Sequence, residues 1–347
     1  MMKAIGYTQS LPVTNPQSLM DIELPQPIAT GRDLLVKVKA IAVNPADYKV
    51  RLNSVPAEGE YKVLGWDAVG VVVAVGENTS HFVPGDIVYY AGDITHQGSN
   101  AEYQLVDERI VGKKPKSLSD AEAAALPLTA ITAWELLFEH LGIKQQSPNN
   151  IKKSNEVILV VGAAGGVGSI LLQIAKAVTG ATIIATASRE SSTQWVKKLG
   201  ADYVVNHNLP LQPQIDALIA NEGMGQVTHV ASLNSTESYF ETYTELLVPF
   251  GKIAMIDDPK TQLDIMKLKS KSLSFHIEFM FARSMFNAAD MQEQSHLLNR
   301  VAELIDQGYV QTTIGKNLGA INAENLRAAH QELEAGKSIG KLVLQGF

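Results

Sequence analysis

The sequence predicts an α/β protein, with a doubly wound parallel sheet in the middle of the chain and a β-rich segment before it. Two observations lead to this prediction. From residue 157 onward, short apolar stretches alternate with helical patterns, as they do in parallel sheets whose strands are joined by helices. A glycine-rich turn, 162–168, also stands between the first of these strands and its helix. A chain of 347 residues is long enough for two domains with a core each.

The segment up to about Lys116 is predicted to be rich in strands. Residues 34–40 alternate between apolar and polar side chains, which is typical of a half-buried strand. Residues 69–75 are almost all apolar, and most are β-branched, which suits a buried strand. A Pro-Gly-Asp turn ending at residue 86 precedes a further strand over 87–90.

Helical character begins at Ser119, which has capping-box spacing to Glu122. Pro127 restarts a helix that ends at Gly142. A polar loop over 145–155 leads to the alternating part of the chain. There we expect strands at 157–161, 182–187, 203–206, 226–231, 252–256 and 341–345, and helices at 169–179, 191–199, 237–247, 292–307 and 323–335.

The glycine-rich turn predicts a dinucleotide-binding site. A strand, a glycine turn and a helix together present backbone N–H groups and the positive end of a helix to a pyrophosphate. The glycines allow the chain to reverse, the phosphate to approach and the helix to pack closely on the strand. The alternative is a turn that binds no ligand. The residues expected at the phosphates are Ala164, Gly165, Gly166, Val167 and Gly168.

The turn does not match two other known classes of nucleotide-binding motif. A P-loop ends in Gly-Lys-Ser/Thr, and this turn does not. The spacing of the glycines also matches short-chain reductases, but that class needs a Tyr-x-x-x-Lys on a later helix. No tyrosine after the turn has a lysine four residues further on.

Ser188 and Arg189 follow the second strand of the alternating part and indicate NADPH. An acidic residue at this place would accept hydrogen bonds from the ribose 2′-hydroxyl of NADH and repel a 2′-phosphate. A hydroxyl and a guanidinium suit the phosphate instead, and such a charge-assisted contact contributes about 1.5–3 kcal/mol. The alternative is that Arg189 is a solvated loop arginine, and Glu190 beside it would weaken the effect.

Composition narrows the possible partners and chemistry. The net charge is −7 and the lysines and arginines are scattered, so we expect no nucleic-acid partner. The chain has no cysteine, which excludes thiolate catalysis and cysteine-ligated metals. We see no signal peptide and no apolar run long enough to span a membrane, and we expect a cytoplasmic protein.

Seven short motifs follow one another along the chain: VNPADYK at 43–49, GWDAVG at 65–70, PGDIV at 84–88, GSNAEY at 98–103, LPLTAITA at 126–133, AGGVG at 164–168 and SIGK at 338–341. In this order they resemble the quinone oxidoreductase (zeta-crystallin-like) branch of the medium-chain dehydrogenase/reductase superfamily. The stretch over 274–286 resembles a bacterial subgroup labelled zinc-type alcohol dehydrogenase-like. The resemblance covers nearly the whole chain.

The resemblance implies a GroES-like catalytic domain over 1–127 and 290–347, with a Rossmann domain over 128–289 inserted into it. It further implies a cleft between the two domains and a homodimer. By the same resemblance, Gly340 and Lys341 contribute to cofactor binding. Trp66, Phe279 and Met280 line an apolar substrate pocket, although the last two could equally belong to a core or to a dimer interface.

The resemblance also places Asn44, Tyr48 and Thr129 around the nicotinamide. Asn44 offers an amide donor, and Tyr48 a hydroxyl that could pass a proton. The Thr129 hydroxyl could hold the carboxamide of the cofactor or the substrate. Each has another interpretation: Asn44 could cap a turn, Tyr48 could be a packing residue, and Thr129 could bond within its own helix.

The zinc label of the subgroup does not suit this sequence. Zinc-dependent relatives have Cys at the position of Asn44 and a His-Glu pair at Trp66-Asp67. A catalytic zinc needs about three protein ligands, and of these residues only Asp67 is a good one. We therefore expect no zinc, and we expect Asp67 to orient its neighbours rather than to act as an acid.

The predicted activity is hydride transfer from NADPH to a quinone or an α,β-unsaturated carbonyl compound, without a metal. Hydrogen-bond donors would then stabilise the charge that develops on the substrate oxygen. Two alternatives remain. One is a zinc-dependent alcohol or aldehyde dehydrogenase, and the other is an NADPH-binding redox sensor with little turnover.

Overall fold

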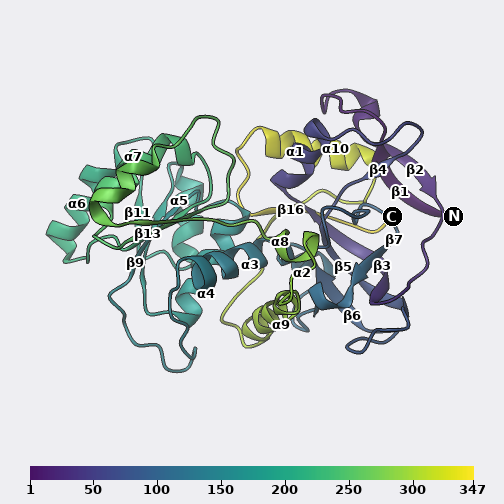
Figure 1. Ribbon diagram of the computed structural model, residues 1–347, viewed down its shortest axis with the longest axis horizontal. Coiled ribbons are helices and arrows are strands. Elements are labelled where there is room, and N and C mark those ends of the chain that lie inside the picture. The colour runs from purple at the N-terminus through teal and green to yellow at the C-terminus, as the bar shows by residue number, and fades with distance from the viewer. The chain divides into compact units, whose positions relative to one another are not determined.

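The computed structural model describes all residues from Met1 to Phe347. The chain divides into two compact units. Unit 1 comprises Met1–Ile131 and Phe281–Phe347, and unit 2 comprises Thr132–Met280. In Figure 1 the purple beginning and the yellow end of the chain lie together in unit 1, whereas the teal and green middle forms unit 2. The middle of the chain is therefore inserted between the two parts of unit 1.

Unit 2 contains a six-stranded parallel sheet in the order β11-β10-β9-β12-β13-β14. The chain starts in the middle with β9, moves outward on one side, and returns past β9 to build the other side. This order confirms the predicted doubly wound, Rossmann-type sheet. The strands are β9 (Val157–Val161), β10 (Thr182–Thr186), β11 (Tyr203–Val205), β12 (His229–Ser232), β13 (Lys252–Met255) and β14 (Ser274–Ile277).

All five residues of β9 are buried, as expected for a central parallel strand covered on both faces. The helices that follow the strands are labelled in Figure 1. They are α4 (Gly166–Val178), α5 (Glu190–Lys198), α6 (Leu211–Glu222) and α7 (Thr236–Leu246), with a 3-10 helix, η4, at Ile265–Lys271. The main apolar core of unit 2 includes Leu159, Ile184, Ile215, Val230 and Tyr243.

Four details of unit 2 differ from the sequence prediction. Helix α6 was not predicted, because two prolines near its beginning obscure the helical pattern, and it ends at Gly223 with φ +65°. Helix α4 begins at Gly166 rather than at residue 169, since the glycines themselves form its first turn. Strand β12 begins at His229, three residues later than expected. Strand β14 was not predicted as an element.

Unit 1 is built on two sheets whose strands pair antiparallel, except that β15 and β16 pair in parallel. The larger one has the order β15-β16-β3-β5-β6-β8, with β7 paired to β3, and the smaller one has the order β2-β1-β4. The strands are β1 (Met2–Tyr7), β2 (Met20–Leu24), β3 (Asp33–Val43), β4 (Lys62–Val63), β5 (Asp67–Val75), β6 (Ile87–Tyr90), β7 (Tyr103–Asp107), β8 (Val111–Lys113), β15 (Ile314–Asn317) and β16 (Lys341–Gln345).

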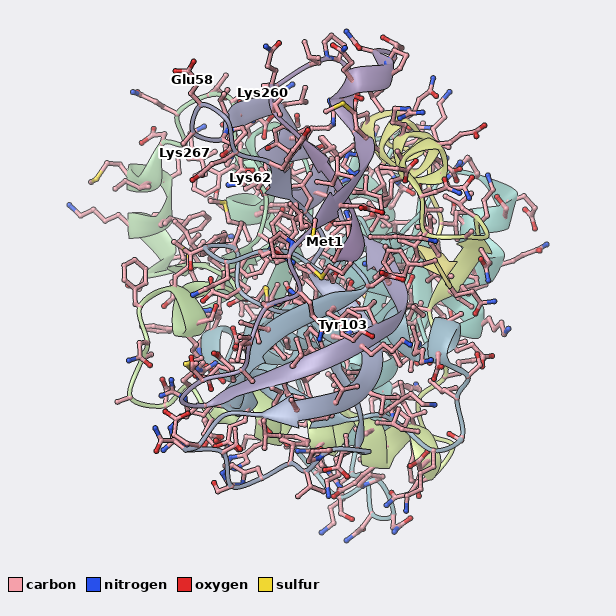
Figure 2. All side chains as sticks on the ribbon, turned by 90° about the vertical axis from the view of Figure 1, so that its right-hand side faces the viewer. Met1, Glu58, Lys62, Tyr103, Lys260 and Lys267 are labelled. Carbon is pink, nitrogen blue, oxygen red and sulfur yellow. The ribbon has the colours of Figure 1, made fainter.

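Strand β16 comes from the end of the chain and pairs antiparallel with β3, with Leu342 opposite Val43. On the outer side of the sheet, the Lys37 ammonium lies 5.9 Å from the ring centre of Tyr103. Figure 2 shows Tyr103 on this face of unit 1, and Glu58 and Lys62 near β4. The pairing of β16 with β3 means that the two parts of unit 1 share one continuous sheet.

The helices outside the parallel sheet are mostly short. They are α1 (Pro45–Asn53), α2 (Asp120–Ala124), α3 (Pro127–Trp134), α8 (Ala282–Met285), α9 (Glu293–Asp306) and α10 (Ala323–Glu334), with η1 (Pro16–Ser18), η2 (Glu108–Ile110) and the π-helical η3 (Glu135–His140). The predicted capping box is present, because Glu122 Oε2 accepts from the Ser119 backbone at 2.9 Å. The predicted helices near 292–307 and 323–335 and the strand at 341–345 are also confirmed.

One helical stretch, Asp120–His140, is long and apolar enough by composition to cross a membrane. Its most apolar window is 89% buried in the structure. A core helix of a globular protein meets the same criteria, and the burial is typical of such a helix.

Candidate functional site

The glycine turn of unit 2 has the geometry of a phosphate-binding loop. Gly162 adopts φ +81°, which only glycine adopts without strain. A Cβ on Gly168 would lie 2.4 Å from the backbone oxygen of Ala163, so this helix packs on the turn more closely than any other residue would allow. The turn is also fixed from β10, since Thr186 Oγ1 accepts from the Gly162 N–H at 3.1 Å.

The beginning of α4 is open to an anion. No side chain caps it, and its first turn holds no acidic residue. The N-terminal amides and the helix dipole therefore have no anionic partner within the helix. The predicted residues Ala164, Gly165, Gly166 and Val167 are partly exposed, and Gly168 is buried beneath them. These residues fit the pyrophosphate of a dinucleotide.

Ser188 and Arg189 lie two and three residues after the end of β10, at the edge of the sheet where the glycine turn also lies. Arg189 is exposed and is the N-cap residue of α5. His207, two residues after β11, lies close to it: burial, and then the charge of the Arg189 guanidinium, lower the pKa of His207. The hydroxyl of Ser188, the guanidinium of Arg189 and the imidazole of His207 thus lie near the carboxyl ends of β10 and β11.

The predicted catalytic residue Asn44 lies in unit 1, where it precedes α1, and its side chain is 1% exposed. Its amide Nδ2 donates to Asp67 Oδ2 at 2.8 Å, and its Oδ1 accepts from the Lys341 ammonium. Lys341 also donates to Asp67 Oδ2 at 2.8 Å and to the Val43 carbonyl at 3.3 Å. We refer to Asn44, Asp67 and Lys341 as the buried polar cluster.

Asp67 connects this cluster to α3. Its Oδ1 accepts from the Leu128 N–H at 2.7 Å, and its backbone carbonyl accepts from Ser99 Oγ at 3.2 Å. Asp67 is fully buried and therefore holds the beginning of α3 beside Asn44. The predicted residue Thr129 follows Leu128 in this helix, and its hydroxyl donates to the Leu126 carbonyl at 3.0 Å.

A second carboxylate, Asp47, lies next to the cluster. It accepts from the Asn44 backbone N–H at 2.8 Å, as the third residue of α1 does in a capping box. Burial raises the pKa of Asp47 to about 7, although the backbone hydrogen bond and the Lys341 charge act in the opposite direction. Tyr48, the next residue, is half-buried, and its hydroxyl has no protein hydrogen-bond partner.

The remaining predicted residues divide between the two units. Trp66 is 1% exposed, packs edge-on against Phe281 with 5.8 Å between ring centres, and has a buried indole N–H without a partner. Phe279 and Met280 belong to unit 2, where Phe279 is 50% exposed and Met280 is 4% exposed. Gly340 and Lys341 belong to unit 1, whereas the other residues predicted to bind the cofactor belong to unit 2.

Sequence reasoning missed His207, and it did not pair Lys341 with Asn44 and Asp67. A histidine two residues beyond a strand is by itself a weak indication of a cofactor site. Its predicted position at the carboxyl edge of the parallel sheet, where cofactors bind, could have drawn attention to His207. The contacts of Lys341 join residues nearly 300 positions apart, and no local pattern reveals them.

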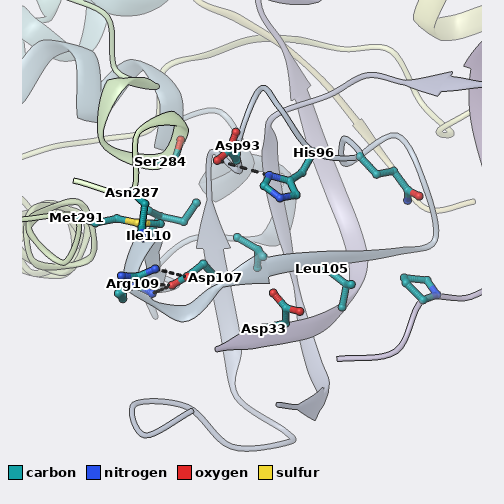
Figure 3. A pocket seen from close by; sticks show the side chains of 13 residues that line it. Asp33, Asp93, His96, Leu105, Asp107, Arg109, Ile110, Ser284, Asn287 and Met291 are labelled. Carbon is teal, nitrogen blue, oxygen red and sulfur yellow. Dashed lines mark hydrogen bonds and ion pairs between the residues drawn. The ribbon is translucent and has the colours of Figure 1, made fainter. Parts of the chain in front are cut away.

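Unit 1 also has a surface pocket of about 410 Å³, lined by residues such as Asp33, Asp93, Asp107, Arg109 and Met291. Figure 3 shows Arg109 paired with Asp107, and His96 next to Asp93. None of the predicted site residues lines this pocket.

Residues 166–300 match the zinc-binding dehydrogenase family, and residues 30–116 match the alcohol dehydrogenase GroES-like domain. A zinc-type alcohol dehydrogenase-like protein of Staphylococcus epidermidis is 40% identical over 343 residues, which is 99% of each chain. This chain is a medium-chain dehydrogenase/reductase. A second relative of this superfamily, the 2-methylene-furan-3-one reductase of Solanum lycopersicum, is 38% identical over 241 residues, covering 65% of this chain and 58% of the relative.

Solved structures of medium-chain dehydrogenase/reductases share the whole fold. A Rhizobium etli CFN 42 protein, described as a zinc-dependent alcohol dehydrogenase, has a TM-score of 0.93 and 49% identity, over 100% of this chain and 98% of that one. The quinone oxidoreductase of Coxiella burnetii has a TM-score of 0.79 and 26% identity, over 100% and 99% of the two chains.

The residues present do not fit the zinc that three of these names mention. At the three expected ligand positions, the Trp66 indole has no lone pair to give, and an amide such as Asn44 is a poor ligand. Both carboxylate oxygens of Asp67 already accept hydrogen bonds, one of them from an ammonium group. No group of three or more His, Cys, Asp or Glu side chains in the structure could hold a metal ion.

Proposed function

We propose that this medium-chain dehydrogenase/reductase is a zinc-independent, NADPH-dependent oxidoreductase that reduces a quinone or an α,β-unsaturated carbonyl compound. The observation that carries the proposal is the buried polar cluster. An ammonium group, Lys341, contacts the side chains at two positions that are zinc ligands in zinc-dependent relatives. A cation is thus already supplied by the chain itself.

Unit 2 is the proposed binding site for NADPH. The glycine turn and the uncapped beginning of α4 would receive the pyrophosphate, and Ser188 and Arg189 would receive the 2′-phosphate. NADPH, when bound, supplies the hydride. Neither Ser188 nor Arg189 carries the acidic group that would favour NADH.

Unit 1 is the proposed source of the groups that receive the acceptor. When hydride reaches a conjugated carbonyl compound, negative charge develops on its oxygen, and a fixed donor lowers the energy of that state. The amide of Asn44 is such a donor. Tyr48, whose hydroxyl has no protein partner, is the proposed proton donor for an enone. The Thr129 hydroxyl donates within its helix and can still accept a hydrogen bond.

Names of relatives support both kinds of acceptor. The tomato relative is named for reduction of a methylene-furanone, which is a conjugated carbonyl compound. The Coxiella burnetii neighbour is named a quinone oxidoreductase. A quinone needs little acid assistance, because its reduced oxygens are already stabilised. Trp66, Phe279 and Met280 are the proposed apolar contacts of such a flat acceptor.

We also propose that the protein is a cytoplasmic homodimer. Strand β14 ends the order of the parallel sheet, so one of its edges has no partner strand. Ile277, the last residue of β14, is 63% exposed, and Phe279, two residues beyond the strand, is 50% exposed. An exposed apolar edge strand favours pairing with another copy. Light scattering with size-exclusion chromatography tests the proposed dimer, and a monomer at micromolar concentration would contradict it.

The test of function follows NADPH absorbance with 9,10-phenanthrenequinone, an enone and an aldehyde in parallel. We expect consumption with the quinone, the enone or both, and none with the aldehyde. Turnover of the aldehyde alone would instead support a zinc-type dehydrogenase. Tight NADPH binding without consumption of any acceptor would support a redox sensor.

A further inference from the structure

The Lys341 ammonium occupies an unusually closed environment. It is 3% exposed, and it lies among three oxygens: Val43 O, Asn44 Oδ1 and Asp67 Oδ2. An ammonium group has three hydrogens to donate, so these three acceptors use its full capacity. Lys341 therefore has no free donor with which to bind a cofactor or a substrate directly.

These contacts determine the orientation of the Asn44 amide. An amide group can rotate so that its oxygen and nitrogen exchange places, and only its hydrogen-bond partners decide between the two orientations. Here an ammonium, which can only donate, faces one end, and a carboxylate, which can only accept while ionised, faces the other. Rotation would place two donors against each other and two acceptors against each other.

One hydrogen of the Asn44 amide remains after these contacts. Nδ2 has two hydrogens, and one of them points to Asp67 Oδ2 at 2.8 Å. The second makes no hydrogen bond within the protein, and it is therefore the one side-chain donor of Asn44 that has no partner. Its direction is fixed by Lys341 and Asp67 together, because both ends of the planar amide are held.

The charges of the cluster also depend on each other. Asp67 is fully buried, and Lys341 is its ion-pair partner at 2.8 Å. Removing one member of a buried ion pair leaves the other charge uncompensated. Without the ammonium, the buried Asp67 carboxylate would have no counter-ion, and the position of the oxygen that accepts from Asn44 Nδ2 would no longer be fixed.

We propose that Lys341 is a positioning residue, which acts through Asn44 by holding its amide with one N–H directed at the oxygen of the reduced acceptor. This inference rests on the proposed function, and it replaces the earlier expectation that Lys341 binds the cofactor. The residue supplies an internal cation, and its effect reaches the substrate only through the Asn44 amide.

The test is a double-mutant cycle with Lys341→Met, Asn44→Ala and the double variant, measured with saturating NADPH and an enone, whose developing oxyanion depends on a donor more than the oxygens of a quinone do. Lys316→Met is the matched control, since Lys316 also pairs with a carboxylate in unit 1, that of Glu332, but at the surface. Thermal unfolding and the Kd for NADPH are measured for every variant. If Lys341→Met does not fold, Lys341→Arg takes its place in the cycle, because it keeps the buried charge but cannot place one nitrogen among three oxygens.

We expect Lys341→Met to lower kcat by about 10- to 100-fold, with the Kd for NADPH changed less than about threefold. The double variant should be no slower than Asn44→Ala alone, because Lys341 acts through a group that is already missing. Lys316→Met should behave as the wild type. Additive losses, or a weaker Kd for NADPH at unchanged kcat, would overturn the inference. If the wild type consumes no NADPH with any acceptor, the proposed function itself has failed.

Discussion

Arg51, on α1, donates through Nε to Nδ1 of His330, on α10, at 3.3 Å, and both side chains are fully buried in unit 1. Arg51 also donates to the Glu334 carboxylate and to the Leu11 carbonyl. Since Nδ1 accepts, His330 is neutral. Burial, and then the charge of Arg51, lower the pKa of His330 to about 3. The two helices are thus joined by a contact that acid would disrupt.

Replacing His330 with Gln is expected to make the protein more resistant to acid. Below pH 6.5 the unfolded chain binds a proton at His330 and the folded protein does not, so stability falls as the pH decreases toward about 3. Between pH 6.5 and pH 4.5, the free energy of unfolding of the wild type should fall by on the order of 2 kcal/mol more than that of His330→Gln. Urea unfolding at several pH values measures it. Parallel pH profiles of the two proteins would contradict the neutral buried histidine.

Substitution of Arg189 by Ala is expected to raise KM for NADPH about 10- to 100-fold and to leave KM for NADH nearly unchanged, because only NADPH has a 2′-phosphate for the guanidinium to bind. Lys198→Ala, on the exposed surface of the same helix, is the control for a general loss of positive charge. Equal effects of Arg189→Ala on both cofactors would remove the assignment of NADPH.

Substitution of Tyr48 by Phe is expected to separate the two classes of acceptor. Reduction of an enone needs a proton, so its kcat should fall at least about tenfold, whereas reduction of 9,10-phenanthrenequinone should change little. Steady-state rates with both acceptors at saturating NADPH measure the difference. Tyr61→Phe removes a hydroxyl from a more exposed tyrosine of unit 1 and serves as the control. An equal loss with both acceptors would mean that Tyr48 has a structural role.

Gly168→Ala is expected to destabilise unit 2 by about 1–3 kcal/mol, since the added Cβ would lie 2.4 Å from a backbone oxygen that cannot rotate away. Gly165→Ala is the matched control for stability, because the nearest atom to its Cβ would be at an ordinary 3.4 Å. Thermal unfolding without cofactor compares the two. If both variants unfold at the same temperature, α4 does not pack this closely on the turn.

Metal analysis of the purified protein is expected to find far less than one zinc per chain, and treatment with EDTA should leave the rate of NADPH consumption unchanged. The reason is the donor set: Asp67 is already held by an ammonium, and Trp66 offers no lone pair. Stoichiometric zinc, together with loss of activity on chelation, would contradict the proposal of a zinc-independent reaction.

Most of the fold could be predicted from local patterns. Strand β9 and the turn after it have a nearly unambiguous composition, and the strand over 341–345 was predicted at its observed bounds. Helix α6 was missed because Pro213 in its first turn reads as a helix breaker, although proline is tolerated there. The pairing of β16 with β3 could not be predicted, because it joins two parts of the chain that are far apart in the sequence.

The candidate site was predictable only in part. Motifs pointed to the glycine turn and to Asn44, since each belongs to a short continuous stretch. The partners of Asn44 lie on β5 and β16, and their contacts depend on how the sheet of unit 1 is assembled. The proximity of His207 to Arg189 likewise depends on two neighbouring strands of the parallel sheet.

The position of β16 has a consequence for how the protein folds during synthesis. The strand lies between β15 and β3 within the larger sheet of unit 1, so this sheet stays incomplete until residue 345 has left the ribosome. Unit 2 is one uninterrupted stretch of chain and can fold earlier. Pairing partners so distant in sequence slow folding, because a long loop must close first. The ammonium group that orients Asn44 thus arrives after every other strand of this sheet has been synthesised.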